Sequence, residues 1–313
     1  MARKKLTEEE KNQMFVENKK YLNELEAKLK TEDGIYQLKY PLCIMSCHNR
    51  KPSILDNLDQ LGNSKINVFI YDFEEDLYNW LNKPNVNKIL VPREYLTCQK
   101  MRVFIQNYMG DQKYWVTDDD LKYIIMHNDK HIVSIGHGLR MLEEFSEGKN
   151  YATIGYGHVE MGVKFWGGDL VSDTYASVTL LYDGKIINEH GLKYTGDSNV
   201  DESLEYIINS HLCGIPVKNC VWGCLVCYEP SGGKKSLAST PENHKHMQES
   251  LYIKYGDYVR ISLEKRRGYT AHCRYGSFGK EKHYDEELLT LCKNGDHDGI
   301  LKYLNNKKEN NKD

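Results

Sequence analysis

Short apolar runs alternate regularly with amphipathic segments between residues 41 and 117, and this alternation constrains the fold more than any other feature. The runs have the length of buried strands, and the segments between them have helical spacing. Strands and helices that alternate with short links form a parallel sheet with right-handed crossovers. The expected strands are 41–47, 66–72, 87–93 and 113–117, and the expected helices are 51–62, 74–82 and 96–110.

The rest of the chain is less regular, and no internal repeat or long linker divides it. Its 313 residues suit one large domain, so we expect a single-domain α/β fold whose mostly parallel central sheet is flanked by helices. Further helices are expected over 5–30, 134–148, 201–214 and 242–256, and further strands over 151–158, 216–229 and 175–185, the last closed by an Asp-Gly turn.

Composition narrows the class of protein. The net charge of −3 provides no overall attraction to nucleic acid or to a membrane, so any basic surface must be local. No window approaches the roughly 18 apolar residues of a membrane span, and the basic start lacks the apolar core of a signal peptide. Nine cysteines, an odd number in a chain that is not small, indicate reduced thiols, so we expect a cytoplasmic protein without a membrane contact.

Three aspartates, Asp118, Asp119 and Asp120, stand at the end of the fourth expected strand in the run YWVTDDDLKYI. Residues i and i+2 at a strand end can turn two carboxylates towards one hard cation, while the middle residue points away. A bound Mg²⁺ or Mn²⁺ can then bridge two phosphate oxygens of a nucleotide. The alternative is a solvated acidic turn, since Asp-x-Asp is common. The position favours function, because ligands of open α/β sheets bind at the carboxyl ends of strands.

Polar residues follow the first two strands at the same expected edge, in SCHNR (46–50) and YDFEE (71–75). Arg50 lies beside an expected helix start, and a guanidinium and a helix N-terminus both suit a diphosphate. Lys100 and Arg102 lie on the helix that precedes the aspartates and have the charge to neutralise phosphate. The alternatives are an ordinary loop and solvated helix charges.

Two further segments are candidates for chemistry. Cys224 and Cys227 form a C-x-x-C without a second pair, and apolar residues surround them, so a buried strand with free thiols is favoured over a zinc site. The stretch 263–280 interleaves basic and aromatic residues, which fits a nucleic-acid strand or a phosphorylated donor, or else a solvated basic edge. No GxSxG, HExxH or complete GxGxxG occurs, so hydrolase, zinc-protease and Rossmann interpretations lack support.

The order of these pieces resembles a GT-A nucleotide-sugar glycosyltransferase, in which an N-terminal nucleotide-binding half ends in a D-x-D at the tip of a strand. More narrowly, it resembles the TET/JBP-associated glycosyltransferases, which include the kinetoplastid base-J glucosyltransferase and phage enzymes that add sugars to hydroxymethylated pyrimidines in DNA. The matching pieces span most of residues 40 to 280: PLCIMSCHNR, ILVPREYLTCQKMRVFIQNY, YWVTDDDLKYI, the VDESLEYI helix followed by a glycine, and RRGYTAHCRYGSF.

The resemblance implies a GT-A fold and metal-dependent transfer of a sugar, with glucose expected, from a UDP-sugar to a hydroxymethylpyrimidine in phage DNA. Mn²⁺ or Mg²⁺ would be the cofactor, modified double-stranded DNA the partner, and the cytoplasm of a phage host the location. The alternatives are a protein or glycan acceptor, or a nucleotide- or nucleic-acid-binding module without catalysis. The implied parts are a helical extension (1–35), a glycosyltransferase domain (36–283) with nucleotide-binding (36–125) and acceptor (126–283) halves, and a C-terminal helix with a polar tail (284–313).

The resemblance also implies a metal site and a set of donor contacts. Asp118 and Asp120 would form the D-x-D, and His272 would be a late metal ligand, with His244 and His246 as alternatives. The other residues expected to bind the donor are Ser46, Asn49, Arg50, Asp72, Lys100, Arg102 and Asp119.

The catalytic base is harder to place. Inverting relatives use a carboxylate near a helix start, often within an E-D pair, but that pair falls here on Ser198-Asn199. Asp201 and Asp197 are therefore the candidates, with Glu202 nearby, and Asp201 is favoured because it keeps the family's position. The residues expected to contact the acceptor or DNA are Arg266, Arg267, Tyr269, Arg274 and Tyr275.

The first prediction concerns DNA binding by the basic-aromatic stretch. Replacing Arg266 and Arg267 by Ala should flatten the slope of log affinity for DNA against log salt by roughly 0.9 for each phosphate that the protein no longer neutralises. The reason is that each cationic side chain releases counterions from the DNA when it binds a phosphate. Binding isotherms over a series of salt concentrations measure the slope, and an unchanged slope would remove this stretch from the DNA footprint.

Overall fold

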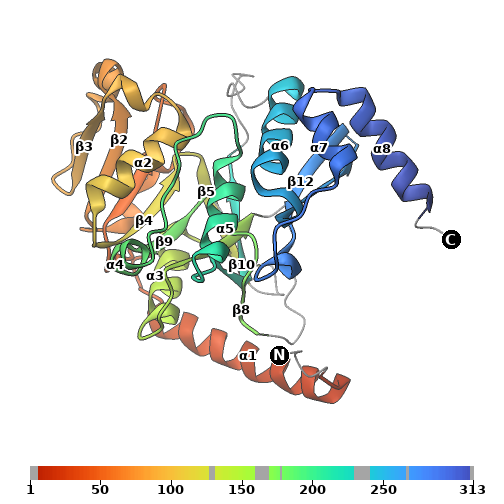
Figure 1. The fold of residues 1–313 in the computed structure, drawn as a ribbon. Helices are drawn as coiled ribbons and strands as arrows, with labels where there is room; N and C mark the ends of the chain where they lie inside the picture. The colour runs from red at the N-terminus through yellow and green to blue at the C-terminus, as the bar shows by residue number, and fades with distance from the viewer. Residues whose placement is uncertain are drawn as a thin grey trace.

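The computed structural model describes residues 6–126, 131–158, 169–176, 178–228, 240–265 and 268–310. The fold is α/β: a ten-stranded mixed sheet is flanked by helices, and a separate two-stranded hairpin lies among the C-terminal helices (Figure 1). The sheet order is β3-β2-β1-β4-β9-β7-β10-β5-β6, and β8 pairs with β10. No helix in the described ranges is both long enough and apolar enough to cross a membrane.

The first half of the sheet is parallel, as predicted. Strands β1 (Leu42–Met45), β2 (Ile66–Tyr71), β3 (Val86–Val91) and β4 (Lys113–Asp118) lie side by side and run in the same direction. Every residue of β1 and β2 is buried, because helices cover both faces of a parallel sheet. The four predicted strands therefore exist close to their predicted bounds.

Two of the three predicted helices in this half are 3₁₀ helices, η1 (Ile54–Leu61) and η2 (Asp72–Tyr78). In η1, Leu55, Leu58 and Leu61 are buried, and the helix is kinked at Asn57, whose backbone angles (φ −128°, ψ 30°) are not helical. The third, α2 (Cys98–Met109), is an α-helix, as predicted, and Thr97 is its N-cap.

The second half of the sheet is mixed, so the predicted mostly parallel arrangement holds only for the first half. Strand β9 pairs antiparallel with both β4 and β7, β7 pairs parallel with β10, and β10 pairs antiparallel with β5. The strands of this half are β5 (Leu121–Met126), β6 (His131–Val133), β7 (Thr153–His158), β8 (Val171–Ser172), β9 (Leu180–Asp183) and β10 (Lys218–Cys227).

The Asp-Gly turn expected to close 175–185 is instead the start of a helix. Asp183 accepts a hydrogen bond from the Ile186 amide and caps α4 (Gly184–Glu189). A Cβ at Gly184 would lie 2.1 Å from the Gly110 carbonyl oxygen, so the close approach of two backbone segments requires glycine here. Tertiary packing, rather than hairpin chemistry, explains this Asp-Gly pair.

The remaining elements complete the layers around the sheet. Cys224 and Cys227 lie in β10 with free thiols, which confirms the predicted strand. The hairpin of β11 (Val259–Glu264) and β12 (Gly268–Cys273) packs against α6. The other helices are α1 (Glu8–Leu29), η3 (Arg93–Tyr95), α3 (Ile135–Ser146), α5 (Glu202–Leu212), α6 (Pro241–Tyr255), η7 (Gly256–Tyr258), η8 (Tyr275–Ser277), α7 (Glu286–Lys293) and α8 (His297–Asn310).

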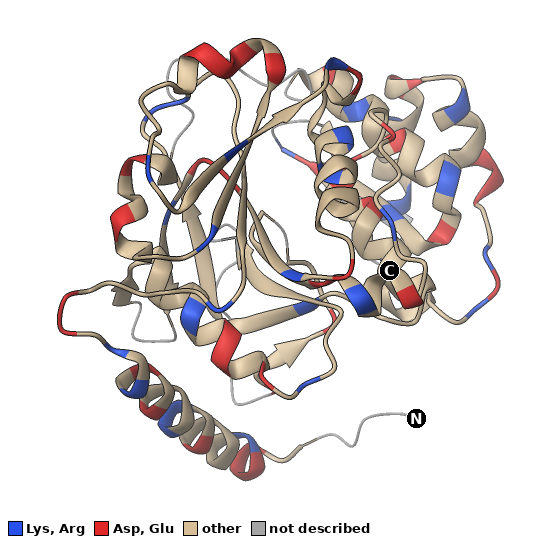
Figure 2. Cartoon of the chain, turned by 90° about the vertical axis from the view of Figure 1, so that its left-hand side faces the viewer, with Lys and Arg blue, Asp and Glu red and all other residues tan. Residues whose placement is uncertain are grey.

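The apolar cores show which helices cover which face. One core joins the sheet to α1, η1 and α3, a second joins it to α2, α4 and α5, and a third lies between α5, α6, the hairpin, α7 and α8. Helix α1 carries acidic and basic residues along most of its length (Figure 2), and only Leu22 and Leu25 of it are buried. This extension therefore docks through a narrow stripe.

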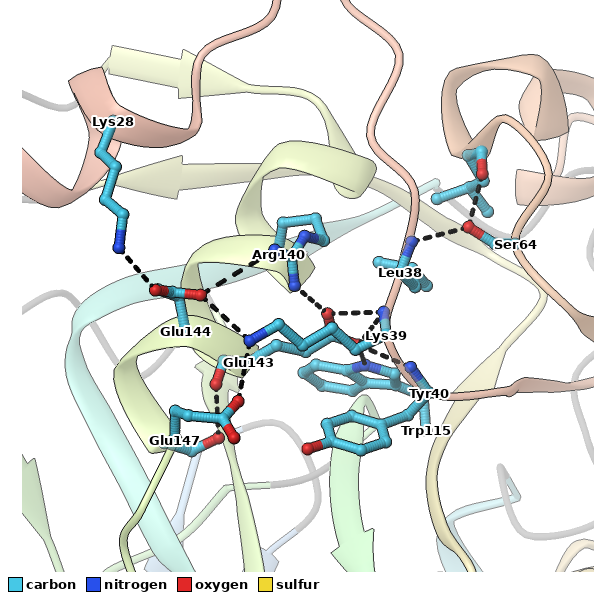
Figure 3. Close-up of polar contacts among 12 residues, drawn as sticks. Lys28, Leu38, Lys39, Tyr40, Ser64, Trp115, Arg140, Glu143, Glu144 and Glu147 are labelled. Atoms are coloured by element: carbon cyan, nitrogen blue, oxygen red, sulfur yellow. Dashed lines mark hydrogen bonds and ion pairs between the residues drawn. The ribbon is translucent and has the colours of Figure 1, made fainter.

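A fully buried carboxylate, Glu143 of α3, fastens the segment between α1 and β1 to the sheet (Figure 3). It accepts hydrogen bonds from the Lys39 amide (2.9 Å), the Tyr40 amide (3.2 Å) and Trp115 Nε1 (3.0 Å). Arg140 Nη1 lies 2.6 Å from the same carboxylate and neutralises it. Four donors that would otherwise be buried without a partner thus share one acceptor group.

The second prediction concerns this carboxylate. Replacing Glu143 by Ala should lower the free energy of unfolding by about 3–5 kcal/mol, because it leaves three donors without their acceptor and leaves Arg140 only its 3.9 Å contact with Glu144. Urea unfolding followed by circular dichroism measures the change. The matched control is Glu147→Ala, one turn further along the chain, whose exposed side chain pairs with Lys39 and should cost about 0.5 kcal/mol or less. Equal losses in the free energy of unfolding for the two variants would show that Glu143 is no more important to stability than an exposed ion-pair residue.

Candidate functional site at the carboxyl edge of the parallel strands

The register of the parallel strands brings the predicted polar residues to one edge. Met45, the last residue of β1, pairs with both Phe69 and Asp118. The residues that follow, Ser46 after β1 and Asp119 after β4, must therefore emerge side by side. Asp72 emerges from β2 at the same edge and is exposed.

The middle aspartate of the cluster points into the protein. Asp119 is completely buried, accepts a hydrogen bond from Ser46 Oγ (2.7 Å) and pairs with Arg50 Nη2 (3.0 Å). Ser46 Oγ is also hydrogen-bonded to the Tyr78 hydroxyl (2.8 Å). Burial raises the pKa of Asp119 to about 6, while Arg50 and Ser46 act in the opposite direction. This carboxylate holds the loop after β1 and is not free to bind a ligand.

The loop that carries Arg50 is held in an uncommon conformation. His48 (φ 61°) and Asn49 (φ 45°) both have left-handed backbone angles, which cost energy in residues other than glycine. The buried carboxylate of Glu74 accepts from the His48 amide (2.9 Å) and lies 2.6 Å from its Nδ1. The Asn49 amide donates to the Tyr78 hydroxyl (2.9 Å). Contacts from η2 therefore fix the loop that aims Arg50 at the aspartates.

Asp118 faces a buried guanidinium. Arg102 of α2 is 4% exposed and donates from Nη2 to Asp118 Oδ1 at 3.1 Å. Its Nε is buried, has no hydrogen-bond partner in the described part of the chain, and lies 3.9 Å from Glu202 Oε1. Although 31% of the Asp118 side chain remains accessible, the surrounding protein raises its pKa, and Arg102 opposes that shift.

Asp120 offers the feature that a cation requires. Its Oδ2 lies 3.7 Å from Arg50 Nη1, whereas its Oδ1 is buried and has no hydrogen-bond partner among the described residues. A carboxylate oxygen left in this way suits a bound metal ion. The chain's own residues thus fit a divalent cation held by Asp118 and Asp120.

The described residues contain no group of three or more His, Cys, Asp or Glu side chains that could hold a metal ion. His272 lies on β12 opposite Arg260, and His244 and His246 lie on α6. The role of His272 as a third ligand stays a prediction. Mg²⁺ commonly completes its shell with water and substrate phosphates, so two carboxylates are a sufficient protein contribution.

The three carboxylates considered for the catalytic base differ in their contacts at the start of α5. Asp201 is the N-cap of α5 and accepts from the Leu204 amide (2.9 Å). Asp197 accepts from the Asn199 amide (3.0 Å) and lies 3.7 Å from Lys254 Nζ. Both side chains are therefore engaged in local structure.

Glu202 is the carboxylate of this segment that faces the aspartates. It lies beside Arg102, and the exposed Cys98 Sγ is 3.5 Å from its Oε1. Burial raises its pKa, the charge of Asp201 raises it further, and Arg102 opposes both. The sequence contains a signal for this: Asp is a preferred N-cap, which turns Asp201 back onto its own helix and leaves the next residue to face the site.

The residues predicted to contact an acceptor are dispersed. Tyr269 is completely buried, and its hydroxyl donates to Glu249 and lies 2.9 Å from His297 Nδ1. It was predicted to contact the acceptor, but its side chain instead packs inside the protein. Arg274 is exposed after β12, and Tyr275 is half-buried against His211. Arg266 and Arg267 lie outside the described residues.

Two other predicted donor residues have different surroundings. Asn49 Oδ1 accepts a hydrogen bond from Trp80 Nε1 (3.1 Å), which occupies it within the loop. Lys100 is exposed in the first turn of α2.

No family model matches the chain, and no curated protein matches it significantly, so the site is interpreted from its geometry.

The third prediction separates capping from chemistry at Asp201. Asp201→Ala should lower the free energy of unfolding by about 0.5–2 kcal/mol, because the Leu204 amide loses its acceptor. Asp201→Asn should stay within about 0.5 kcal/mol of the parent, since Asn caps helices as well as Asp does. Thermal unfolding of both variants measures the difference, and equal stabilities would contradict the cap.

Proposed function

We propose that the chain is a metal-assisted GT-A glycosyltransferase that uses a UDP-sugar. The observation that carries the proposal is the aspartate cluster at the end of β4. Asp118 and Asp120 remain available to a cation, while Asp119 is buried and bound by Ser46 and Arg50. Arg50, about one-third exposed, adds a cationic side chain at the same edge. Carboxylates, a guanidinium and parallel strand ends are the combination expected for a diphosphate bound with a metal.

A divalent cation bound by Asp118 and Asp120 would supply charge neutralisation at the leaving diphosphate as the sugar–oxygen bond breaks. The protein's own residues prepare the site for this. Arg102 holds Asp118 in place from beneath, and Arg50 holds Asp119 and approaches Asp120. Such fixed charges stabilise developing charge without reorganising during the reaction.

Glu202 is the residue that we assign as general base. It faces Arg102 and Asp118 from the start of α5, whereas Asp201 and Asp197 are engaged locally. Its raised pKa makes it a stronger proton acceptor, and the guanidinium of Arg102 opposes that shift. In this assignment Glu202 takes the proton from the attacking hydroxyl of the acceptor.

The acceptor proposed is a hydroxymethylpyrimidine in DNA, on the strength of the resemblance and of local basic residues. The exposed Arg260 and Arg274 of the hairpin segment support a polyanionic partner in a chain whose net charge is −3. A protein or glycan acceptor is the second candidate. A nucleotide-binding module without catalysis is the third, and the absence of an E-D pair at the expected position is the sequence feature that favours it.

The fourth prediction tests donor and metal together. Hydroxymethylated DNA incubated with the protein, Mn²⁺ and a panel of UDP-sugars should gain the mass of one sugar per modified base. Asp118→Asn and Asp120→Asn should each abolish the mass shift and weaken UDP binding. Asp120→Asn should do so with little change in melting temperature, whereas Asp118→Asn should also melt lower, because it removes a charged partner of the buried Arg102. Normal turnover by both variants would show that the site lies elsewhere, and no transfer to any acceptor would favour the module without catalysis.

The fifth prediction concerns the base. Glu202→Gln should slow the single-turnover rate by roughly 10²–10⁴-fold and leave UDP affinity nearly unchanged, because a base acts on the chemical step. The matched control is Asp201→Asn, one residue away, which should slow that rate less than tenfold. If the two variants exchange these behaviours, Asp201 is the base and the assignment of Glu202 is wrong.

A further inference from the structure

A second concave site lies far along the chain from the aspartate edge. A cavity of about 920 Å³ opens between β11, α7 and α8, and all its lining residues fall between Tyr252 and Lys308. Its floor is apolar and includes Val259, Ile261 and Leu288. Cavities of this volume are typical of small-molecule sites. In Figure 1 these elements lie on the opposite side of α5 from β4.

The charged residues around this cavity are mainly cationic. Arg260, Arg274, Lys307 and Lys308 line it, against Asp257 and Asp285. Asp285 is already satisfied, because Lys307 Nζ lies 2.7 Å from it and the Tyr303 hydroxyl donates to it.

The two arginines among these cations have no carboxylate partner in the described part of the chain. Arg260 lies opposite His272 in the hairpin register, and Arg274 directly follows β12. Both are exposed, and neither makes an ion pair with any described residue. An anionic group of a ligand would supply the charge partner that these guanidinium groups lack among the described residues.

We propose that this cavity binds a nucleoside phosphate, independently of the donor site and of any metal. Guanidinium groups pair with phosphate in two-pronged geometry, and Arg260 and Arg274 stand at the rim. Tyr252, Tyr284 and Tyr303 line the same cavity. Tyr252 and Tyr303 are buried, and the half-buried Tyr284 supplies the ring against which a base can pack. The shared chemistry is a nucleotide, either free or as one residue of a single strand.

The test is calorimetric titration of the full chain in EDTA with UTP, ATP, tripolyphosphate and octathymidylate as probes. At least one of the nucleoside triphosphates or the octathymidylate should bind, and more tightly than tripolyphosphate, because the tyrosine ring recognises the base. A preference for a triphosphate assigns the site to free nucleotides, and a preference for the oligonucleotide assigns it to a strand. Arg260→Ala and Arg274→Ala should each weaken binding by about tenfold or more.

Two controls keep this result separate from the donor site. EDTA in every titration removes the divalent cation through which the aspartate edge is proposed to hold a diphosphate. Lys185→Ala, an equally exposed helix cation far from the cavity, should leave the affinity unchanged. Binding of no probe, tripolyphosphate binding as tightly as the nucleotides, or undiminished affinity in both arginine variants would overturn the proposal. None of these outcomes depends on glycosyl transfer.

Discussion

The buried guanidinium of Arg102 is the charge on which the candidate site depends. Taking such an ion out of water costs several kcal/mol unless charged or aromatic partners replace the solvent. Its surroundings come from three separate segments: Asp118 at the end of β4, the Tyr194 ring (5.8 Å) before α5, and Glu202 in the first turn of α5. The need to satisfy Arg102 therefore holds the parallel half of the sheet and α5 in one arrangement.

A second ion pair divides the aspartates by role. Arg50 and Ser46 both bind the buried carboxylate of Asp119, and these contacts fix the loop after β1. The loop therefore cannot move without exposing a buried charge. Asp118 and Asp120, on either side, stay partly accessible, and Asp120 Oδ1 has no hydrogen-bond partner in the described ranges. Three consecutive identical residues thus differ in their contacts: β4 ends at Asp118, and in the turn that follows Asp119 is buried while Asp120 stays partly accessible.

The features that local chemistry dictates were predictable from the sequence, and those that distant segments decide were not. The apolar runs at 42–45 and 66–71 were predictable as strands, since both are bounded by polar residues, and so was the D-x-D at a strand end. That η1 is a 3₁₀ helix was hidden, because its leucines fit both helical spacings. The inward position of Tyr269 fits the alternation of Tyr269 and Ala271 with the polar Thr270 and His272. Its hydrogen-bond partners Glu249 and His297 come from two other helices, and no hairpin pattern contains that information.

The most direct test of a metal site at the aspartate edge is diffraction from crystals soaked with UDP and Mn²⁺, with data collected at the manganese absorption edge. We expect one anomalous peak within coordination distance of carboxylate oxygens of Asp118 and Asp120, beside the bound diphosphate. Glu202 and Arg102 should keep their positions. A diphosphate bound elsewhere, or UDP bound at this edge with no manganese on either aspartate, would contradict the proposed site.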